Sequence, residues 1–413
     1  MNRLIKPLII ATTAIAFGST ANLHAQAKAD GPDSVGALLL EQEKRGSEGI
    51  IEDWNGIKTS IKDDTGFAFG IDYTTQIFAA TSAPDGAEDF SGGGIARVYG
   101  RWEFVNPGET ANNGSLNWKV EHRHSYTDVA PRGHLLNLGY VGAAGATFSD
   151  QEFRTTNLYW RQAFGDQVIG YLGYLYVPTF TDAFELISPW SGFTHLGLAS
   201  GQGTTAFPSD SAFGAMLGGW LTDNLYVIGS IADRNSDPTD PFRSAETFFD
   251  ESEYWKSVEI GLSSSQVPWF RDNVHVTFWH VDESTVFGAP EGWGVNFAAS
   301  KWIDKTWMPF VRAAYAEDAG SPSLLETSVT AGAAFHVRND KDLFAVGFNW
   351  QSPNEVTFGG LDLDNQFAIE MFYRTPVGQN LEVTPSVQLL FDPALNPAED
   401  FLAVFGFRGK LAF

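Results

Sequence analysis

Hydrophobic and polar residues alternate in steps of two through most of the chain beyond residue 66. In the segment 95–104, Arg97 and Arg101 fall on one face of an extended chain, whereas Val98 and Trp102 fall on the other. A period of two predicts a β-strand with one apolar and one polar face. Because the polar face carries full charges, it suits a water-filled lumen better than a dry protein core.

The same alternation predicts about sixteen strands. They lie near 66–79, 93–105, 115–126, 152–164, 167–178, 212–221, 224–232, 254–264, 273–281, 293–302, 308–316, 327–337, 343–351, 366–375, 381–391 and 401–413. The connections alternate in length: 165–166 and 222–224 are tight turns, whereas 179–211 and 233–253 are long and acidic. Short turns at one end and long loops at the other are typical of a transmembrane antiparallel β-barrel. An even number of strands leaves both termini in the periplasm.

The N-terminal residues have the order of a secretory signal peptide. Arg3 and Lys6 precede an apolar stretch at 8–17, and small residues lead to a cleavage site after Ala27. Residues 28–65 form a segment expected to be partly helical, which lies in the periplasm or plugs the lumen; a partner-binding segment is the alternative. Residues 66–413 form the predicted barrel. No later apolar run reaches the ~18 residues that a membrane helix needs.

Composition excludes several classes of function. The formal net charge is −24 and becomes −26 once Arg3 and Lys6 are removed, which argues against nucleic acid as a partner. The chain has no cysteine, so thiol catalysis and cysteine metal sites are excluded. His122 and His124 fall on the apolar face, and no further ligands accompany them. We therefore expect neither a metal site nor a cofactor.

The inward-facing charges are the candidate functional residues. They are expected to form a pore constriction whose fixed charges orient water and bind polar solutes. The candidates are Arg97, Arg101, Glu103, Lys119, Glu121, Arg123, Arg161, Glu259, Arg312, Glu370 and Arg374. Among them, Glu121, Arg123 and Arg161 are expected to point inward from neighbouring strands and to reach one another or a shared solute.

The long connection 179–211 is expected to fold into the lumen. Phe184, Trp190 and Phe193 are too apolar for an exposed loop, and aromatic rings suit the apolar faces of sugars. The connection 233–253 is more acidic and is expected to stay on the surface. Solvated surface remains the alternative for 179–211.

The last strand carries a candidate assembly signal. Phe405, Phe407, Leu411 and the terminal Phe413 share one face, a pattern that resembles the signal read by the outer-membrane barrel-assembly machinery. Phe413 also fits an aromatic girdle at the membrane interface, and both roles are compatible.

The C-terminal residues resemble the carbohydrate-selective porins of Gram-negative outer membranes. The resemblance rests on Glu370-x-x-Tyr373-Arg374, Thr384-Pro385-Ser386-Val387-Gln388, Asp392-Pro393 with Asn396-Pro397, and Gly406-Phe407-Arg408 before Phe413, with weaker matches at Trp54-Asn55-Gly56 and Gly66. It implies a sixteen-stranded channel that takes up small sugars across the outer membrane. Where that family usually has leucine before the late arginine, this chain has Phe407, so the resemblance names no particular sugar.

Other functions stay open at this point. A general, non-selective porin would have the same fold, and a structural barrel would have a plugged lumen. An outer-membrane enzyme would need a catalytic pairing, but the sequence has no Gly-x-Ser-x-Gly motif and no convincing His/Ser or His/Asp pair. The expected partners are small polar solutes, outer-membrane lipids and the assembly machinery. The sequence does not decide between a monomer and a homotrimer.

Overall fold

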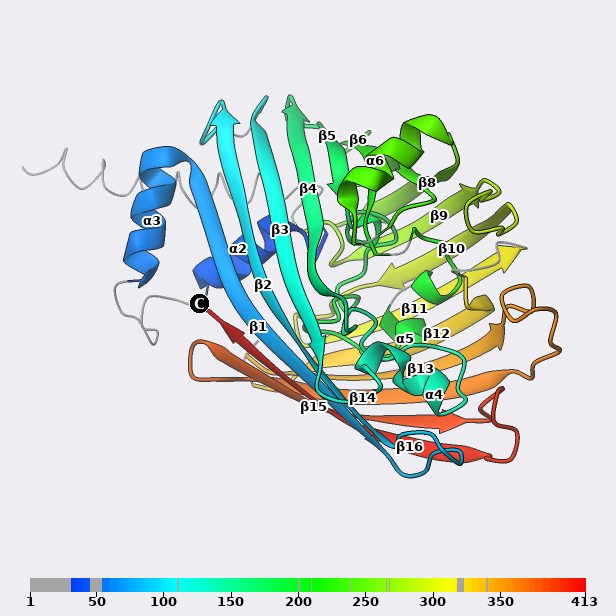
Figure 1. The fold of residues 1–413 in the computed structure, drawn as a ribbon. Coiled ribbons are helices and arrows are strands. Elements are labelled where there is room, and N and C mark those ends of the chain that lie inside the picture. Colours follow the sequence, from blue (N-terminus) through cyan, green and yellow to red (C-terminus); the bar gives the residue numbers. More distant parts are fainter. Residues whose placement is uncertain are drawn as a thin grey trace, which may run out of the picture.

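The structure, a computed structural model, is a closed antiparallel β-barrel of sixteen strands in sequence order, with β1 paired to β16 (Figure 1). It describes residues 31–44, 54–109, 111–199, 201–208, 210–237, 239–264, 266, 268–317, 323–338 and 341–413. The predicted fold is confirmed, and each predicted strand agrees with an observed one to within three residues at either end. The predicted signal peptide, 1–27, lies outside the described residues.

The strands are β1 Phe67–Ala80, β2 Phe90–Val105, β3 Gly114–Ser125, β4 Glu152–Phe164, β5 Val168–Leu175, β6 Ala212–Trp220, β7 Leu225–Asp233, β8 Tyr254–Ser263, β9 Asn273–Val281, β10 Gly292–Ser300, β11 Trp307–Glu317, β12 Leu325–His336, β13 Leu343–Pro353, β14 Gln366–Val377, β15 Leu381–Phe391 and β16 Phe401–Ala412. The helices are α2 Val35–Lys44, α3 Trp54–Thr65, α4 His134–Asn137, α5 Leu196–Ala199 and α6 Pro241–Asp250, with 3₁₀ turns at Pro131–Gly133, Val177–Thr179 and Gly201–Gly203.

Side chains alternate between the outer wall and the lumen along each strand. On β8, the outward Val258, Ile260 and Leu262 are each about half exposed, whereas the inward Glu259 is completely buried. Outward apolar side chains suit the hydrocarbon of a bilayer, and inward polar ones suit the lumen. Among the described residues, none of the helices has the length and apolarity to cross a membrane.

The first and last strands close the barrel. Asp72 to Ala80 of β1 pair with Ala412 back to Val404 of β16, and the backbone amide of Phe413 donates to Ile71 O at 2.9 Å. A barrel needs this seam because an open sheet edge would leave backbone groups unpaired in lipid. The start of β1 and the end of β16 therefore lie at the same end of the barrel, the end with the short turns.

The two N-terminal helices lie in different places. Before β1, α2 lies inside the lumen, where Val35, Leu38 and Leu39 are buried against Tyr99 of β2. By contrast, α3 stands beside the start of β1 (Figure 1), where Trp54 packs edge-on against the outward ring of Phe69. The described part of the 28–65 segment is thus helical, with one helix in the lumen and one at the rim.

The connection between β5 and β6, residues 176–211, crosses the lumen; it is called the inner loop here. Its residues Phe180, Phe184 and Phe193 are nearly inaccessible to solvent. This inward path agrees with the one predicted from the apolar residues of 179–211. The connection between β7 and β8 differs, since α6 lies on its course and exposes Phe242 and Phe249 by 76% and 68%.

The alternation of short and long connections predicts which end faces outward. A single cysteine replacing Leu361, exposed in the long 354–365 connection, should react with a membrane-impermeant maleimide on intact cells. One replacing Asp223, in the short turn 221–224, should react only after permeabilisation. The chain has no other cysteine, so the wild type gives the background. Labelling at residue 223 in intact cells would reverse the orientation.

Candidate functional site

Four inward side chains of alternating charge stand side by side on β1 to β4. Strand pairing places Asp72 opposite Arg97, Arg97 opposite Glu121, and Glu121 opposite Arg154. Neighbouring strands lie ~4.8 Å apart, so the four groups form a continuous line across the wall. We call Asp72, Arg97, Glu121 and Arg154 the charged row. A line of alternating charges produces a field directed along the wall.

Arg154 joins this row because β4 contains an irregularity. Lys119 of β3 pairs with Asn157, but the next residue, Val120, pairs with Thr155, so Thr156 is an extra residue in β4. An extra residue reverses the in-and-out alternation on one side of it. Arg154 and Arg161 therefore both face the lumen, although they are seven positions apart and regular alternation would place them on opposite faces.

Arg97 is held rigidly in the row. Its Nε and NH2 atoms donate to the two carboxylate oxygens of Asp72 at 2.7 and 2.8 Å. On its other side, the guanidinium lies 3.8 Å from the ring centre of Trp190, which belongs to the inner loop. A bidentate pair combined with a stacked ring fixes both the position and the plane of the guanidinium.

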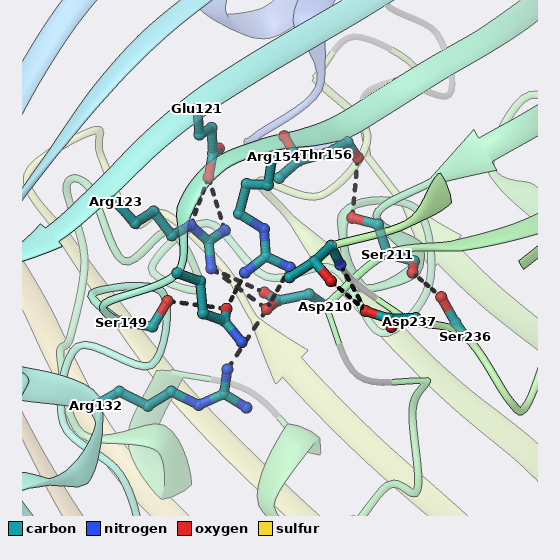
Figure 2. A network of polar contacts seen from close by, with 12 residues as sticks. Glu121, Arg123, Arg132, Ser149, Arg154, Thr156, Asp210, Ser211, Ser236 and Asp237 are labelled. Atoms are coloured by element: carbon teal, nitrogen blue, oxygen red, sulfur yellow. Dashed lines mark hydrogen bonds and ion pairs between the residues drawn. The ribbon is translucent and has the colours of Figure 1, made fainter. Parts of the chain in front are cut away.

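Asp210, at the end of the inner loop, forms ion pairs with three arginines (Figure 2). Arg123 NH1 lies 3.2 Å from its Oδ1, and Arg154 NH2 and Arg132 NH1 lie 3.1 and 3.4 Å from its Oδ2. Arg123 also donates from Nε to Glu121 Oε2 at 2.8 Å. Glu121, Arg123, Arg132, Arg154 and Asp210 are called the Asp210 cluster. It links the loop to β3 and β4.

The charge state of Asp210 follows from this setting. Burial alone would raise the pKa of its carboxyl, but Arg123, Arg154 and Arg132 outweigh burial and hold the pKa well below the usual aspartate range. A depressed pKa means that the link is fully formed above the ordinary carboxyl pKa. It is lost only as the pH falls through the depressed value.

The site carries a positive excess, although the whole chain is acidic. The row and the cluster together hold four cations and three carboxylates: Arg97, Arg123, Arg132 and Arg154 against Asp72, Glu121 and Asp210. Beside them, Lys119 lies 3.3 Å from Glu121, and the buried Asp33 interacts with Lys119 and Arg97. Arg132 is 42% exposed and lines a cavity of about 490 Å³ together with Asp210 and Tyr176. Guanidinium groups offer several planar N–H donors, so the site can donate hydrogen bonds to hydroxyls in that cavity.

The candidate charges on the later strands contact the inner loop. Glu370 accepts hydrogen bonds from the backbone of Thr194 and His195. Arg374 donates to Ser191 O at 2.8 Å, and Glu259 accepts from the backbone of Asp182 at 2.6 Å. Arg312 likewise lies 2.6 Å from Asp182 Oδ2. These charges hold the loop in place through hydrogen bonds to its backbone and an ion pair with Asp182.

The three aromatic candidates of the loop are packed in its contacts with the wall. Phe184 and Phe193 pack against Phe310 of β11, and Phe193 also meets Phe372 of β14. Trp190 packs against Phe148 and stacks on Arg97. All three side chains are 2% exposed or less. Of the three, Trp190 is therefore the one next to the charged row.

The remaining early-strand candidates lie at different levels of the lumen. Lys119 is 3.3 Å from Glu121 and belongs with the row. Arg101 donates to Asn117 Oδ1 at 2.8 Å and lies four residues along β2 from Arg97, nearer the short turns. Glu103 lies at the short-turn rim, where the amide of Gly108 is 3.5 Å from its Oε2.

Arg161 does not lie beside Arg123, so the expected grouping of Glu121, Arg123 and Arg161 is wrong in part. Arg161 pairs with Ser115, whereas Glu121 pairs with Arg154. Six residues of β3 separate these levels, which is about 20 Å along the strand. The correction has a simple cause: β3 and β4 run antiparallel, so facing inward from adjacent strands does not ensure the same height.

Sequence reasoning missed Asp72, Arg154 and Asp210. Asp72 could have been identified from the sequence, since it shares the polar face of β1 with Thr74 and Gln76. Arg154 was hidden by the extra residue Thr156. Asp210 lies in a connection without periodicity, so no local signal pointed to it. Within the described ranges, no group of three or more His, Asp or Glu residues is arranged to hold a metal ion.

Comparison with known proteins agrees with this architecture. Residues 288–413 match the model of the carbohydrate-selective porin, OprB family. The chain is similar to the high-pH structure of Pseudomonas putida OprB, with a TM-score of 0.68 and 14% identity over 89% of this chain and 99% of that one. The low-pH structure of that protein gives a TM-score of 0.53 at 12% identity, covering 89% of this chain and 100% of that one.

A substituted Rh. blastica porin is also similar, with a TM-score of 0.51 and 11% identity over 84% of this chain and 100% of that one. A comparison with curated protein sequences found no match. At these identities, the solved structures establish the porin fold. The family match covers the C-terminal strands from β10 onward.

Replacing Asp210 by Asn should release the end of the inner loop. The three arginines would lose a shared counter-charge, and breaking a buried ion pair on one side typically costs about 3–5 kcal/mol. We expect a lower unfolding midpoint in urea, a higher single-channel conductance and a stronger preference for anions. Asp362→Asn, which removes one exposed charge in the 354–365 connection, is the matched control. Identical conductance and stability in the two variants would show that Asp210 does not hold the loop.

Proposed function

We propose that this barrel, whose residues 288–413 belong to the carbohydrate-selective porin, OprB family, is an outer-membrane porin that passes small sugars. The family and the porin fold indicate a channel, not an enzyme. The observation that carries the proposal is the Asp210 cluster, in which arginines from β3, β4 and the 126–151 connection converge on the inner loop and of which Arg132 and Asp210 line the 490 Å³ cavity.

The proposed mechanism is an exchange of hydrogen bonds. A sugar entering a narrow passage loses part of its hydration, and fixed donors and acceptors on the wall replace the lost bonds. Arg132 lines the cavity and is paired with Asp210, which Arg123 and Arg154 hold in turn, so the N–H groups of Arg132 need little rearrangement to reach a hydroxyl. Weak binding of this kind favours entry of the sugar and still allows it to leave.

A general, non-selective porin is the competing function. It would use the same barrel, and its wall charges would only set the ion preference. The partly exposed Arg132, which is paired with Asp210 at the cavity wall, favours the selective channel because its planar N–H donors can bind several hydroxyls of one sugar.

The proposed location is the outer membrane, with lipids as the surrounding partners. Support comes from the outward aromatic residues at the strand ends, such as Phe164, Trp293, Trp307 and Phe335, each between 36% and 55% exposed. Aromatic girdles of this kind lie at the two membrane interfaces of outer-membrane barrels. Assembly through the barrel machinery, with Phe413 in its signal, remains a prediction, and a monomer and a homotrimer are both compatible with the sequence.

Solute passage and two arginine variants test the proposal. Liposomes containing the protein should swell faster in glucose and other neutral sugars than in amino acids or organic acids of similar size. Arg123→Ala should raise the ion conductance and weaken the block of that current by sugar about tenfold. Arg243→Ala, which removes an exposed positive charge on α6, should leave sugar block within about twofold of the wild type. The tenfold change corresponds to about 1.4 kcal/mol, close to the contribution of one charged hydrogen bond.

Swelling rates that depend on solute size alone would contradict a selective channel. Equal loss of sugar block in the Arg123 and Arg243 variants would also contradict it, because the effect would then come from overall charge rather than from the cluster.

A further inference from the structure

Arg161 lies in a second cavity, far from the Asp210 cluster. This cavity encloses about 300 Å³ at the short-turn end of the lumen and is bordered by Arg161, the turn residue Asp166, and the rings of Trp220, Tyr226 and Trp269. Ala163 of β4 and Gly218 of β6 also line it. Small residues at these two inward positions leave the space open, because longer side chains there would project into it.

The three rings form a rigid aromatic corner. Trp220 meets Tyr226 edge-on at 5.4 Å between ring centres, and Tyr226 meets Trp269 edge-on at 5.0 Å. The hydroxyl of Tyr226 is engaged outside the cavity, since it donates to Glu259 Oε1 and accepts from Asn273 Nδ2, both at 2.9 Å. Tyr226 therefore contributes an apolar ring face in a fixed orientation.

Trp269 contributes a polar group as well as a ring. It lies in the 264–272 connection and is 1% exposed. Its backbone carbonyl accepts a hydrogen bond from Asn273 Nδ2 at 3.2 Å. Its indole N–H is buried and has no hydrogen-bond partner among the described residues. A buried donor without an acceptor costs about 1–3 kcal/mol, so an unpaired indole at a cavity wall favours a ligand that can accept a hydrogen bond there.

We propose that this cavity is an exit site for a single sugar ring, in which the apolar C–H face of the sugar packs on the aromatic corner while its hydroxyls meet the Trp269 indole and Arg161. The proposal rests on the proposed function, since it supposes that sugars reach the lumen. A volume of about 300 Å³ is at the lower limit of ordinary ligand pockets, so the site selects a monosaccharide over a disaccharide.

The position of the cavity gives it a role in passage. A sugar released from the Asp210 cluster has about 20 Å of wall to follow before the short turns. A second weak site on that path shortens each step between sites, and several weak sites favour passage over retention. Arg161 is a charged residue that lies on this path and also lines the cavity.

Equilibrium binding tests the exit site without requiring conduction. The probe is D-glucose, compared with maltose, observed by saturation-transfer NMR on the detergent-solubilised full-length protein. The Arg123→Ala background removes the contribution of the Asp210 cluster. In that background, glucose should bind and maltose should bind at least tenfold more weakly.

Two further variants address the cavity itself. Ala163→Leu fills it and should weaken glucose binding more than tenfold. Trp269→Phe keeps the ring but removes the N–H and should weaken binding about fivefold, the effect of one hydrogen bond. Ala331→Leu, on the exposed outer wall of β12, is the control and should bind as the background does. Heat-modifiable migration on gels confirms that each variant is folded.

Unchanged glucose binding in both Ala163→Leu and Trp269→Phe would overturn the exit site, and so would equal binding of maltose. The outcome is separable from the proposed function. If liposomes fail to swell in sugars but the binding pattern holds, the porin proposal falls and the site stands. If sugars pass but no variant alters binding, the site falls alone.

Discussion

The constraint on which this structure depends is that every charge facing into the barrel must meet a partner. Lumen-facing charges on both halves of the wall come into contact with a loop that folds inward, and a buried charge is tolerated only when it is paired. The inner loop supplies those partners: Asp210 for arginines of β3 and β4, and backbone amides for Glu259 and Glu370. The charges of the wall therefore fix the position of the loop, and the loop in turn pairs those charges.

This constraint divides the lumen into parts with different tasks. On β8 to β16, the inward charges hold the loop through its backbone and through Asp182. On β1 to β4, they form the charged row and the Asp210 cluster, where guanidinium groups from the wall meet the end of the loop. The helix α2 lies against the same wall, and Lys410 of β16 binds its Glu41 at 2.8 Å. Near the short turns, the rings of Trp220, Tyr226 and Trp269 line a cavity together with Arg161.

The alternation of residues was enough to predict the barrel, because a period of two is a local property that each strand displays by itself. The faces of Arg97, Glu121 and Arg123 followed for the same reason. Heights within the lumen did not follow, since they depend on the register between strands: Arg161 was placed beside Arg123 but lies near Ser115. Arg154 could not be assigned because the extra residue Thr156 reverses the alternation, and Asp210 because loop contacts depend on the whole fold.

The central claim is that the inner loop is a fixed wall of the channel. An ideal Cβ on Gly197 of the loop would lie 3.1 Å from Asn349 Cγ on β13, a spacing that suits a disulfide between cysteines at these positions. Single-channel recordings of the Gly197→Cys/Asn349→Cys protein, oxidised and then reduced, test the claim most directly. A fixed loop predicts the same conductance and the same block by glucose in both states. A channel that closes on oxidation, or loses its glucose block, would contradict it.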